Sequence, residues 1–518
     1  MNRAEKLCAL REQFDVLVIG GGATGLGIAF DAQTRGFKTA LVEAGDFAQA
    51  TSSRATKLVH GGVRYLASGQ IHLVYEALHE RKVMLRSAPH LVQALPFITP
   101  AYRWFDLPYY GAGLKLYDIL SGRSTMGPTQ ILSAQETEQR IPNIEKKSLK
   151  GGILYHDGQF DDARLALTVA RTAEDYGAIV LNYVRCVELV KEQGKVRGAL
   201  VEDAETGSRA MVVASLVINA TGIFVDSIRE QDKPGIPRLL SVSRGTHIVV
   251  APEVLGGNNA IMVPKTEDGR VIFAIPWLGK VVIGTTDIPV EKAVMEPGFE
   301  RSEIDYLIEH INPYLSREIG TQDVLSVFSG LRPLVTGKEA TTSKLSREHH
   351  IDASSSGLVT VAGGKWTTYR RMAEDTLNFA ISHKLIAAKK PCVTRQERLH
   401  GTDPALPTSG FLAHYGADAK KVRALLESSS ALEEFIDPAL PFTLAEVVFA
   451  VREEMARTVE DVLSRRMRAL LLDSAAARRA APHVAGIMAA ELGYGNEWIT
   501  QQVTAFGELA KHSYQLKA

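Results

Sequence analysis

Three glycines near the start of the chain have the spacing of a dinucleotide-binding turn. Gly20, Gly22 and Gly25 fit the pattern G-x-G-x-x-G, which directly follows the apolar run FDVLVI at 14–19. The first glycine permits the tight turn, the second lets a pyrophosphate approach the backbone, and the third lets the next helix pack closely. Free N–H groups at the start of that helix, at Ala23 and Thr24, attract phosphate. The spacing therefore predicts binding of an adenine dinucleotide.

A carboxylate completes this motif. Glu43 ends a second apolar segment, KTALVEAG at 38–45. It follows the glycines by about 20 residues, the separation at which the acid of this motif accepts from a ribose hydroxyl. NAD and FAD both carry this ribose, so the motif alone does not separate them.

The next segment, AQATSSRATKLVHGGVRYL at 48–66, favours FAD. Hydroxyl groups and a closely approaching backbone suit a flavin ring and its pyrophosphate, whereas a polar surface loop needs neither a glycine pair nor so many donors. The relevant residues are the hydroxyls Thr51, Ser52, Ser53 and Thr56, the cations Arg54, Lys57 and Arg64, and His60 beside Gly61 and Gly62.

These groups must be positioned by a sheet whose strand ends meet at the cofactor. The run at 14–19 suits a buried parallel strand, and LGIAFDAQTRG at 26–36 predicts a helix ending at its last glycine. Further on, the periodicity predicts a helix at 161–177, strands at 195–203, 211–222 and 357–363, and a helix from about 366. Two of these strands end in Ala-Thr-Gly at 220–222 and in the glycine pair 363–364, which we expect beside the same cofactor.

Composition and charge exclude several classes of protein. The 518 residues include 59 Lys and Arg and 59 Asp and Glu, so the net charge is zero and we expect no nucleic-acid partner. With 45% hydrophobic and 23% charged residues, the chain is expected to fold into about two or three domains. Three widely separated cysteines favour a reducing compartment. We expect no metal site, no signal peptide and no membrane-spanning helix.

Motifs along nearly the whole chain, in order, carry a resemblance to a known family. They are TSSRATKLVHGGVRYL at 51–66, SRGTHIVV at 243–250, MVPKTEDGRVIFAIPW at 262–277, VVIGTTD at 281–287, SGLRPL at 329–334, AGGKWTTYRRMAEDT at 362–376 and the helical segment 442–468. The sequence resembles the FAD-dependent respiratory glycerol-3-phosphate dehydrogenases. It departs from their pattern at Ile223 and Phe224, where Pro-Trp is common, and at Trp366, where Leu is commoner.

The resemblance implies the fold and its divisions. The fold expected is an α/β FAD-binding Rossmann-type domain, like those of glutathione reductase and D-amino-acid oxidase, with an inserted mixed-sheet substrate domain and an all-α C-terminal domain. We expect the FAD-binding domain at 1–85, 150–225 and 354–384, the substrate domain at 86–149 and 235–350, and the helical domain at 395–518.

The resemblance also extends the expected cofactor site. FAD is expected to be bound without a covalent link, because no flavin-linking His or Cys motif is evident. The expected contacts are Gly20, Gly22, Ala23, Thr24, Gly25, Glu43, Thr51, Ser52, Ser53, Lys57, Leu58, His60, Gly61, Gly62, Ala220, Thr221, Gly222, Gly364, Lys365, Trp366 and Thr367.

The substrate that the resemblance implies is sn-glycerol 3-phosphate, which is oxidised to dihydroxyacetone phosphate. Its phosphate needs fixed cations, and the family pattern points to Arg54, Arg332 and Lys365. A base must take the hydroxyl proton during hydride transfer from C2 to the flavin. The catalytic candidates are His60, Lys265 and His247, together with Arg332; the sequence leaves the choice of base open, and the resemblance slightly favours Lys265 and His60.

The electron acceptor separates the alternatives. A respiratory dehydrogenase passes electrons to a quinone, a related oxidase uses oxygen and forms hydrogen peroxide, and a non-catalytic flavin-binding scaffold does neither. The segment FITPAYRWFDLPYYGAGLKLY at 97–117 is rich in aromatic rings and contains Arg103 and Lys115, a mixture that suits a membrane interface. With the resemblance, this favours a peripheral protein in the cytoplasm at the inner face of the cytoplasmic membrane, with quinone as partner; a homodimer stays open.

The C-terminal part has helical periodicity and few β-branched runs. Thr443 is a candidate N-cap with Glu446 three residues later, which predicts a capping box. Arg465, Arg466 and Arg468 form a small basic group there, which we interpret as a solvated helix face.

Overall fold

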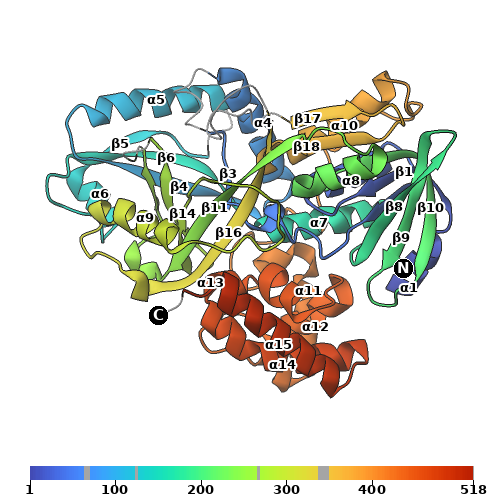
Figure 1. Cartoon of the computed structure of the whole chain (residues 1–518). Helices are drawn as coiled ribbons and strands as arrows, with labels where there is room; N and C mark the ends of the chain where they lie inside the picture. The colour runs from blue at the N-terminus through green and yellow to red at the C-terminus, as the bar shows by residue number, and fades with distance from the viewer. Residues whose placement is uncertain (63–69, 123–125, 265, 267–268, 337–348, 517–518) are drawn as a thin grey trace.

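Two β-sheets lie side by side above a group of C-terminal helices in the computed structural model (Figure 1). The structure describes residues 1–62, 70–122, 126–264, 266, 269–336 and 349–516. Lys265 and Arg64 therefore lie outside the described residues.

The first sheet has the parallel core that the glycine motif requires. Its strands follow the order β17-β18-β10-β1-β2-β7, and every pair from β18 to β7 is parallel. Strands β8 and β9 continue the sheet from β10 in antiparallel pairs. The bounds are β1 Gln13–Ile19, β2 Thr39–Val42, β7 Ile179–Leu181, β8 Val184–Glu192, β9 Lys195–Asp203, β10 Arg209–Asn219, β17 His349–Ala353 and β18 Val359–Gly363.

Helices cover this sheet and account for its apolar strands. All four residues of β2 are buried, as are the last four of β1, which is the pattern of parallel strands packed on both faces. A hydrophobic core joins β1 and β2 to α2 Ala23–Thr34, α7 Asp162–Asp175 and α10 Tyr369–Ser382. Helix α7 begins at the N-cap Asp161, whose side chain accepts from the N–H groups of Ala163 and Arg164. The remaining helices of this part are α1 Arg3–Ala9, α4 Ile71–Ser87 and α8 Val225–Asp232.

The second sheet is mixed and lies beside the first. Its order is β15-β11-β14-β13-β12-β4-β6-β3, with β16 paired to β11 and β5 paired to β6. The long pair of β11 and β16 runs from Leu240 opposite Val335 to Val250 opposite Val324. The bounds are β3 Leu58–Val59, β4 Val92–Ala101, β5 Gln130–Ser133, β6 Gly151–Phe160, β11 Leu240–Val250, β12 Ala260–Val263, β13 Ile272–Trp277, β14 Lys280–Gly284, β15 Ile288–Val290 and β16 Val324–Val335, with helices α5 Asp106–Ser121, α6 Ala134–Arg140 and α9 Arg301–Ile311.

Three strands cross the predicted domain boundaries: β6 and β3 lie in the second sheet, and β17, whose first residues fall within the predicted substrate domain, lies in the first. The sequence analysis places 150–160 with the FAD-binding domain, but β6 pairs along its length with β4 and at its end with β3. Strand β3 itself, within the range 1–85, also belongs to the second sheet. The predicted ranges are continuous stretches of sequence, whereas sheet membership is decided by hydrogen bonds between segments that are distant in the chain.

The C-terminal helices pack on the second sheet rather than standing apart. Their core includes Val249 of β11, Phe328 of β16 and Trp277 of β13. The predicted capping box of Thr443 and Glu446 is confirmed at the start of α12. The helices are α11 Ala419–Ser428, α12 Leu444–Glu453, α13 Ala469–Leu472, α14 Ser474–Leu492 and α15 Asn496–Ser513.

The interpretation of Arg465, Arg466 and Arg468 as a solvated face is wrong. Each of the three is at most 2% exposed. They lie between α12 and the start of α13, where this part of the chain meets the FAD-binding part, and buried carboxylates neutralise them. Helical periodicity alone cannot distinguish a charged face turned to water from one turned to buried acids.

Candidate active site

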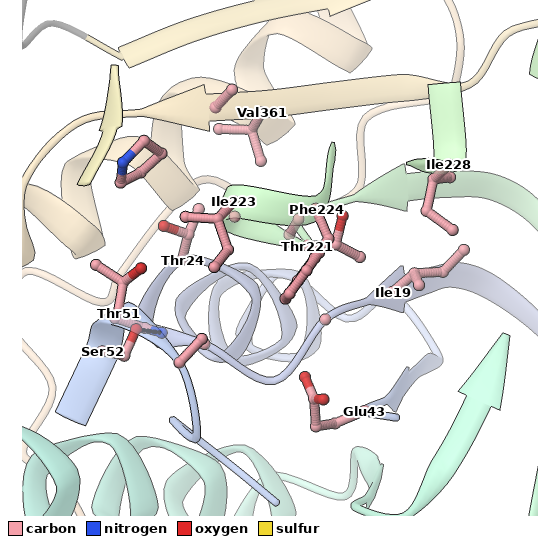
Figure 2. Close-up of a pocket in the computed structure, with 18 of the residues that line it drawn as sticks. Ile19, Thr24, Glu43, Thr51, Ser52, Thr221, Ile223, Phe224, Ile228 and Val361 are labelled. Atoms are coloured by element: carbon pink, nitrogen blue, oxygen red, sulfur yellow. Dashed lines mark hydrogen bonds between the residues drawn. The ribbon is translucent and has the colours of Figure 1, made fainter. Parts of the chain in front are cut away.

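A cavity of about 470 Å³ opens where the strands of the first sheet end at the N-terminus of helix α2. Figure 2 shows the labelled side chains around the end of this helix, with Thr51 and Ser52 on one side and Ile19 and Ile228 on the other. The second sheet also contributes, since Pro333 of β16 lines the cavity, and Met295 from the segment between β15 and α9 lies beside it in the lining. The predicted cofactor residues in the lining are Gly20, Gly22, Ala23, Thr24, Glu43, Thr51, Ser52, Ala220, Thr221, Gly222, Gly364, Lys365 and Trp366.

Close packing explains two of the motif glycines. Gly20 has a φ of +114°, and a Cβ there would lie 2.5 Å from the carbonyl oxygen of Ala220. A Cβ on Gly25 would lie 1.9 Å from the carbonyl oxygen of Gly20. Gly25 therefore acts through helix–strand packing and does not itself line the cavity.

The start of helix α2 suits an anion. Its N-cap, Gly22, has no side chain to cap the first turn, and the N–H of Ala23 donates to Ser52 Oγ at 3.0 Å. Trp366 Nε1 in turn donates to the carbonyl oxygen of Ser52 at 2.8 Å, which fixes the loop at the helix end. A phosphate at this end would meet the N–H groups and the positive pole of the helix dipole.

Glu43 lies in the cavity wall at the end of β2. Its two carboxylate oxygens accept from the backbone N–H groups of Gly21 at 2.6 Å and Gly45 at 2.8 Å. Burial raises its pKa above the ordinary value, against the lowering effect of these bonds. A carboxylate accepts about four hydrogen bonds, so acceptor capacity is left for ribose hydroxyls. The glycines, the uncapped helix end and this carboxylate together fit an adenine dinucleotide such as FAD.

Several predicted cofactor residues support the cavity from behind. Lys57 is fully buried, donates to both oxygens of Asp162 at 2.8–2.9 Å, and lies over the rings of Trp277 and Phe328. The N–H of Gly61 donates to the hydroxyl of Tyr117 at 2.7 Å. The cavity lining does not include Gly25, Ser53, Lys57, Leu58, His60, Gly61, Gly62 or Thr367. Of these, Lys57, Ser53 and Gly61 make hydrogen bonds within the protein that support the loop at 51–62, and contact of all eight with the cofactor stays a prediction.

Arg332 lies beside the cavity on strand β16, next to the lining residue Pro333. Its guanidinium donates to Asp287 Oδ1 at 3.2 Å, to Thr285 Oγ1 at 3.0 Å and to the carbonyl oxygen of Thr286 at 3.1 Å. A Cβ on Gly245 of β11 would overlap this guanidinium, so glycine there leaves the space that Arg332 fills.

His247 lies on β11 near Arg332. Its Nε2 is 2.9 Å from Thr56 Oγ1, its ring stacks on Phe328 at 4.6 Å, and its buried Nδ1 has no hydrogen-bond partner among the residues that the structure describes. Burial lowers the pKa of His247 well below its ordinary value, and the positive charges of Arg332 and Lys57 lower it further. The imidazole is therefore neutral near pH 7 and has a lone pair for a proton.

Arg54 makes different contacts from those expected of a phosphate ligand. It is buried, pairs with the carboxylate of Glu296, and donates to the carbonyl oxygens of Met295 at 2.8 Å and Ser329 at 3.4 Å. It does not line the cavity. In this arrangement a substrate phosphate would compete with Glu296 for the Arg54 guanidinium.

The cavity also has walls that motif reasoning missed. Arg185 and Cys186 of β8 and Ser227 and Gln231 of α8 line it, together with Gln49. No local pattern marks these residues, because their position depends on how β8 and α8 pack at the edge of the first sheet.

Comparison with known proteins agrees with this geometry. Residues 15–370 match the family model described as FAD dependent oxidoreductase, and residues 360–498 match that of the C-terminal domain of alpha-glycerophosphate oxidase. The mitochondrial glycerol-3-phosphate dehydrogenases of Macaca fascicularis and Homo sapiens are 41% and 42% identical over 95% and 93% of this chain, covering 72% and 71% of their own lengths. The structure of the glycerol-3-phosphate dehydrogenase from Bacillus halodurans, complexed with FAD, is 30% identical with a TM-score of 0.80 over 99% of both chains.

Proposed function

This chain belongs to the FAD-dependent oxidoreductases and, within them, to the glycerol-3-phosphate dehydrogenases, and on that premise we propose that it oxidises sn-glycerol 3-phosphate and delivers the electrons to a quinone. The product is dihydroxyacetone phosphate. FAD is the cofactor of this family, and the observation that carries the proposal is the dinucleotide cavity with Arg332 and His247 beside one end.

The cavity residues hold FAD in defined roles. Gly22 and Thr24 would hold the pyrophosphate, and Glu43 would accept from a ribose hydroxyl. Thr51 and Lys365 also line the cavity, and Thr51 Oγ1 donates to the carbonyl oxygen of Leu331 in the second sheet at 2.7 Å, so the flavin ring would lie on this side. When bound, FAD supplies a two-electron acceptor for hydride from C2 of the substrate.

Arg332 binds the substrate phosphate in this proposal, with Arg54 and Lys365 as further cations. The fork of guanidinium donors matches phosphate oxygens, and Asp287 keeps the Arg332 fork in one orientation. For Arg54 the phosphate would compete with Glu296, its present anionic partner.

The base that takes the hydroxyl proton is proposed among His247, His60 and Lys265. His247 is neutral near pH 7, and its Nδ1 has no hydrogen-bond partner among the described residues, so the ring can accept a proton there in the tautomer that carries its hydrogen on Nε2. His60 is half-buried in the loop after β3. A comparison of His247→Asn and His60→Asn tests the assignment, because loss of the base lowers kcat and removes the acidic limb of its pH profile.

Helix α5 offers the surface for membrane contact. Trp104, Phe105, Tyr109, Leu116 and Ile119 are exposed hydrophobic residues on α5 and the turn before it, and we call them the α5 patch. Arg103 lies over the Phe105 ring and Lys150 over the Trp104 ring, so cations border the patch. Apolar rings edged by cations fit the headgroup level of an anionic bilayer.

We therefore propose peripheral attachment at the inner face of the cytoplasmic membrane, where a quinone is accessible. Among the described residues, no helix has the length and apolar character needed to cross a bilayer.

Anaerobic reduction tests the oxidation reaction. Glycerol 3-phosphate should bleach the oxidised flavin absorbance of the purified protein, whereas a flavin-binding scaffold would keep its absorbance unchanged. The reduced protein is then mixed with a soluble quinone or with oxygen in a stopped-flow instrument.

Faster reoxidation by quinone is the expected result. The competing function is an oxidase. The match of the C-terminal part to an alpha-glycerophosphate oxidase domain is the observation that favours it. Rapid reoxidation by oxygen with release of hydrogen peroxide, and no gain from quinone, would establish the oxidase instead.

A further inference from the structure

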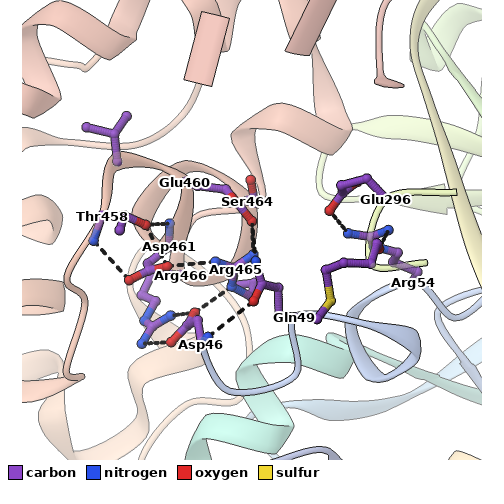
Figure 3. A network of polar contacts seen from close by, with 12 residues as sticks. Asp46, Gln49, Arg54, Glu296, Thr458, Glu460, Asp461, Ser464, Arg465 and Arg466 are labelled. Atoms are coloured by element: carbon purple, nitrogen blue, oxygen red, sulfur yellow. Dashed lines mark hydrogen bonds and ion pairs between the residues drawn. The ribbon is translucent and has the colours of Figure 1, made fainter. Parts of the chain in front are cut away.

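Two buried arginines of the C-terminal helical domain form ion pairs with the loop that follows strand β2 (Figure 3). Arg465 and Arg466 both donate to the carboxylate of Asp46, with Nη2 of Arg466 at 2.9 Å from Oδ1. Asn182 Nδ2 adds a third donor at 3.0 Å. Burial raises the pKa of Asp46, but the two guanidinium groups outweigh it and lower the pKa, so this fully buried carboxylate is ionised.

Asp46 lies within the segment 43–49, which we call the ribose loop. Glu43, Ala48 and Gln49 of this loop line the cavity on either side of Asp46. The N–H of Ala48 donates to the carbonyl oxygen of Gly21 at 3.0 Å, and Gln49 Nε2 donates to Glu460 of the C-terminal domain at 3.3 Å. A displacement of Asp46 would therefore move groups on the cavity wall.

A third arginine of the C-terminal domain, Arg468, bonds to the segment 51–57, which we call the flavin loop. Arg468 Nη2 donates to the carbonyl oxygen of Ser53 at 2.6 Å and to Asp162 Oδ1 at 2.8 Å. Asp162 also accepts from the N–H of Ala55 at 2.8 Å. The cavity-lining residues Thr51 and Ser52 directly precede these contacts.

Stability alone does not require such a cluster. A buried ion pair is often replaced by apolar side chains of similar volume without loss of stability. A guanidinium fork does what apolar packing cannot, because its donors bind carboxylate and carbonyl oxygens in one fixed orientation. The arginines are thus suited to setting the orientation of the loops rather than to joining the domains.

We propose that Arg466 and Arg468 are positioning residues for FAD, through which the C-terminal helical domain holds the ribose loop and the flavin loop in their cofactor-binding geometry. The cofactor site is then built from both ends of the chain, although the C-terminal domain does not line the cavity. The inference rests on the pocket holding FAD and is independent of the substrate.

The FAD dissociation constant of Arg466→Met tests this role. We expect it to rise by about 5–150-fold, the usual range of coupling between separate sites. Apoprotein is titrated with FAD and followed by flavin fluorescence, while the melting temperature of the same apoprotein is recorded. Arg466→Lys keeps the charge without the fork and should give an intermediate dissociation constant.

Arg171→Met is the matched control. Arg171 of α7 pairs with Asp418, so it also bridges the FAD-binding part and the C-terminal domain, with both side chains largely buried. It contacts neither loop. We expect this variant to lower the melting temperature and to leave the FAD dissociation constant at the wild-type value.

Equal FAD affinity in wild type, Arg466→Met and Arg171→Met would overturn the inference, whatever the melting temperatures. If Arg466→Met does not fold, Glu460→Ala decides. Its side chain is 25% exposed and contacts Gln49 and Arg465, so a folded variant is expected with FAD affinity lowered a few-fold. Unchanged affinity in this variant would equally overturn the inference. A wild-type chain that takes up no FAD would instead overturn the proposed function.

Discussion

Replacing Phe105 and Tyr109 together by alanine should detach the protein from membranes without affecting its chemistry. These side chains are 61% and 69% exposed. An aromatic side chain presents about 200 Å² in total, so the two leave about 260 Å² of their surface in water. At about 25 cal/mol per Å², full insertion of both rings is worth about 6 kcal/mol, and insertion to half depth about 3 kcal/mol. The half-depth value corresponds to a loss of about 100-fold in the partition coefficient.

Cosedimentation with liposomes containing anionic lipid measures this partition coefficient. A control variant, Phe411→Ala with Phe435→Ala, removes two rings of similar exposure from the C-terminal domain, which lies at the other end of the molecule from α5 (Figure 1). The control should sediment like wild type, and both variants should reduce a soluble dye at the wild-type rate. Wild-type sedimentation of the Phe105 and Tyr109 variant would refute the assignment of the α5 patch.

Three further changes probe other parts of the molecule. Arg332→Ala should cost about 2–5 kcal/mol of transition-state binding, measured as kcat/KM for glycerol 3-phosphate, and wild-type turnover would remove Arg332 from the phosphate site. Gly25→Ala places a Cβ 1.9 Å from a carbonyl oxygen and should abolish FAD uptake, whereas Gly486→Ala, with open space around its Cβ, should be stable and loaded. Burial lowers the pKa of His400, but hydrogen bonds to Asp175 and Asp418 outweigh it and raise the pKa to about 8. Because the folded-state value lies above the unfolded one, this stabilisation is complete below about pH 6.5 and lost as the pH rises through 8. In urea unfolding, the free energy of unfolding of His400→Gln should lie about 1–2 kcal/mol below wild type at pH 6 and equal wild type at pH 9. This difference is reduced from the full pKa shift because His400 is partly exposed.

Local spacing was enough to predict the dinucleotide end of the site. Gly20, Gly25 and Glu43 act through turns, a helix start and a strand end, which are set within a few residues, and the structure places them as the motif requires. The order of the later motifs likewise predicted an FAD fold with a mixed second sheet and a helical C-terminal domain, which the comparisons confirm.

Interactions between segments distant in sequence could not be predicted from local spacing. The partner of Arg54 is Glu296, and no motif connects the two. Strand β6 joins the second sheet through β4, and the buried arginines after α12 meet acids far away in sequence. In each case the sequence gives the residue type, but the partner of that residue is set by the tertiary fold.

The pairing of Asp46 with Arg466 has a consequence for biosynthesis. The two residues are 420 positions apart. A ribosome adding about 5–20 residues per second needs about 20–80 s to make the intervening chain, and throughout that time Asp46 has no arginine partner. The nucleotide-binding part is therefore synthesised first, but the arginines that fix its loops are made only near the end of translation. Cofactor loading is expected to follow release of the finished chain, and a chain truncated before residue 465 should accumulate without bound flavin.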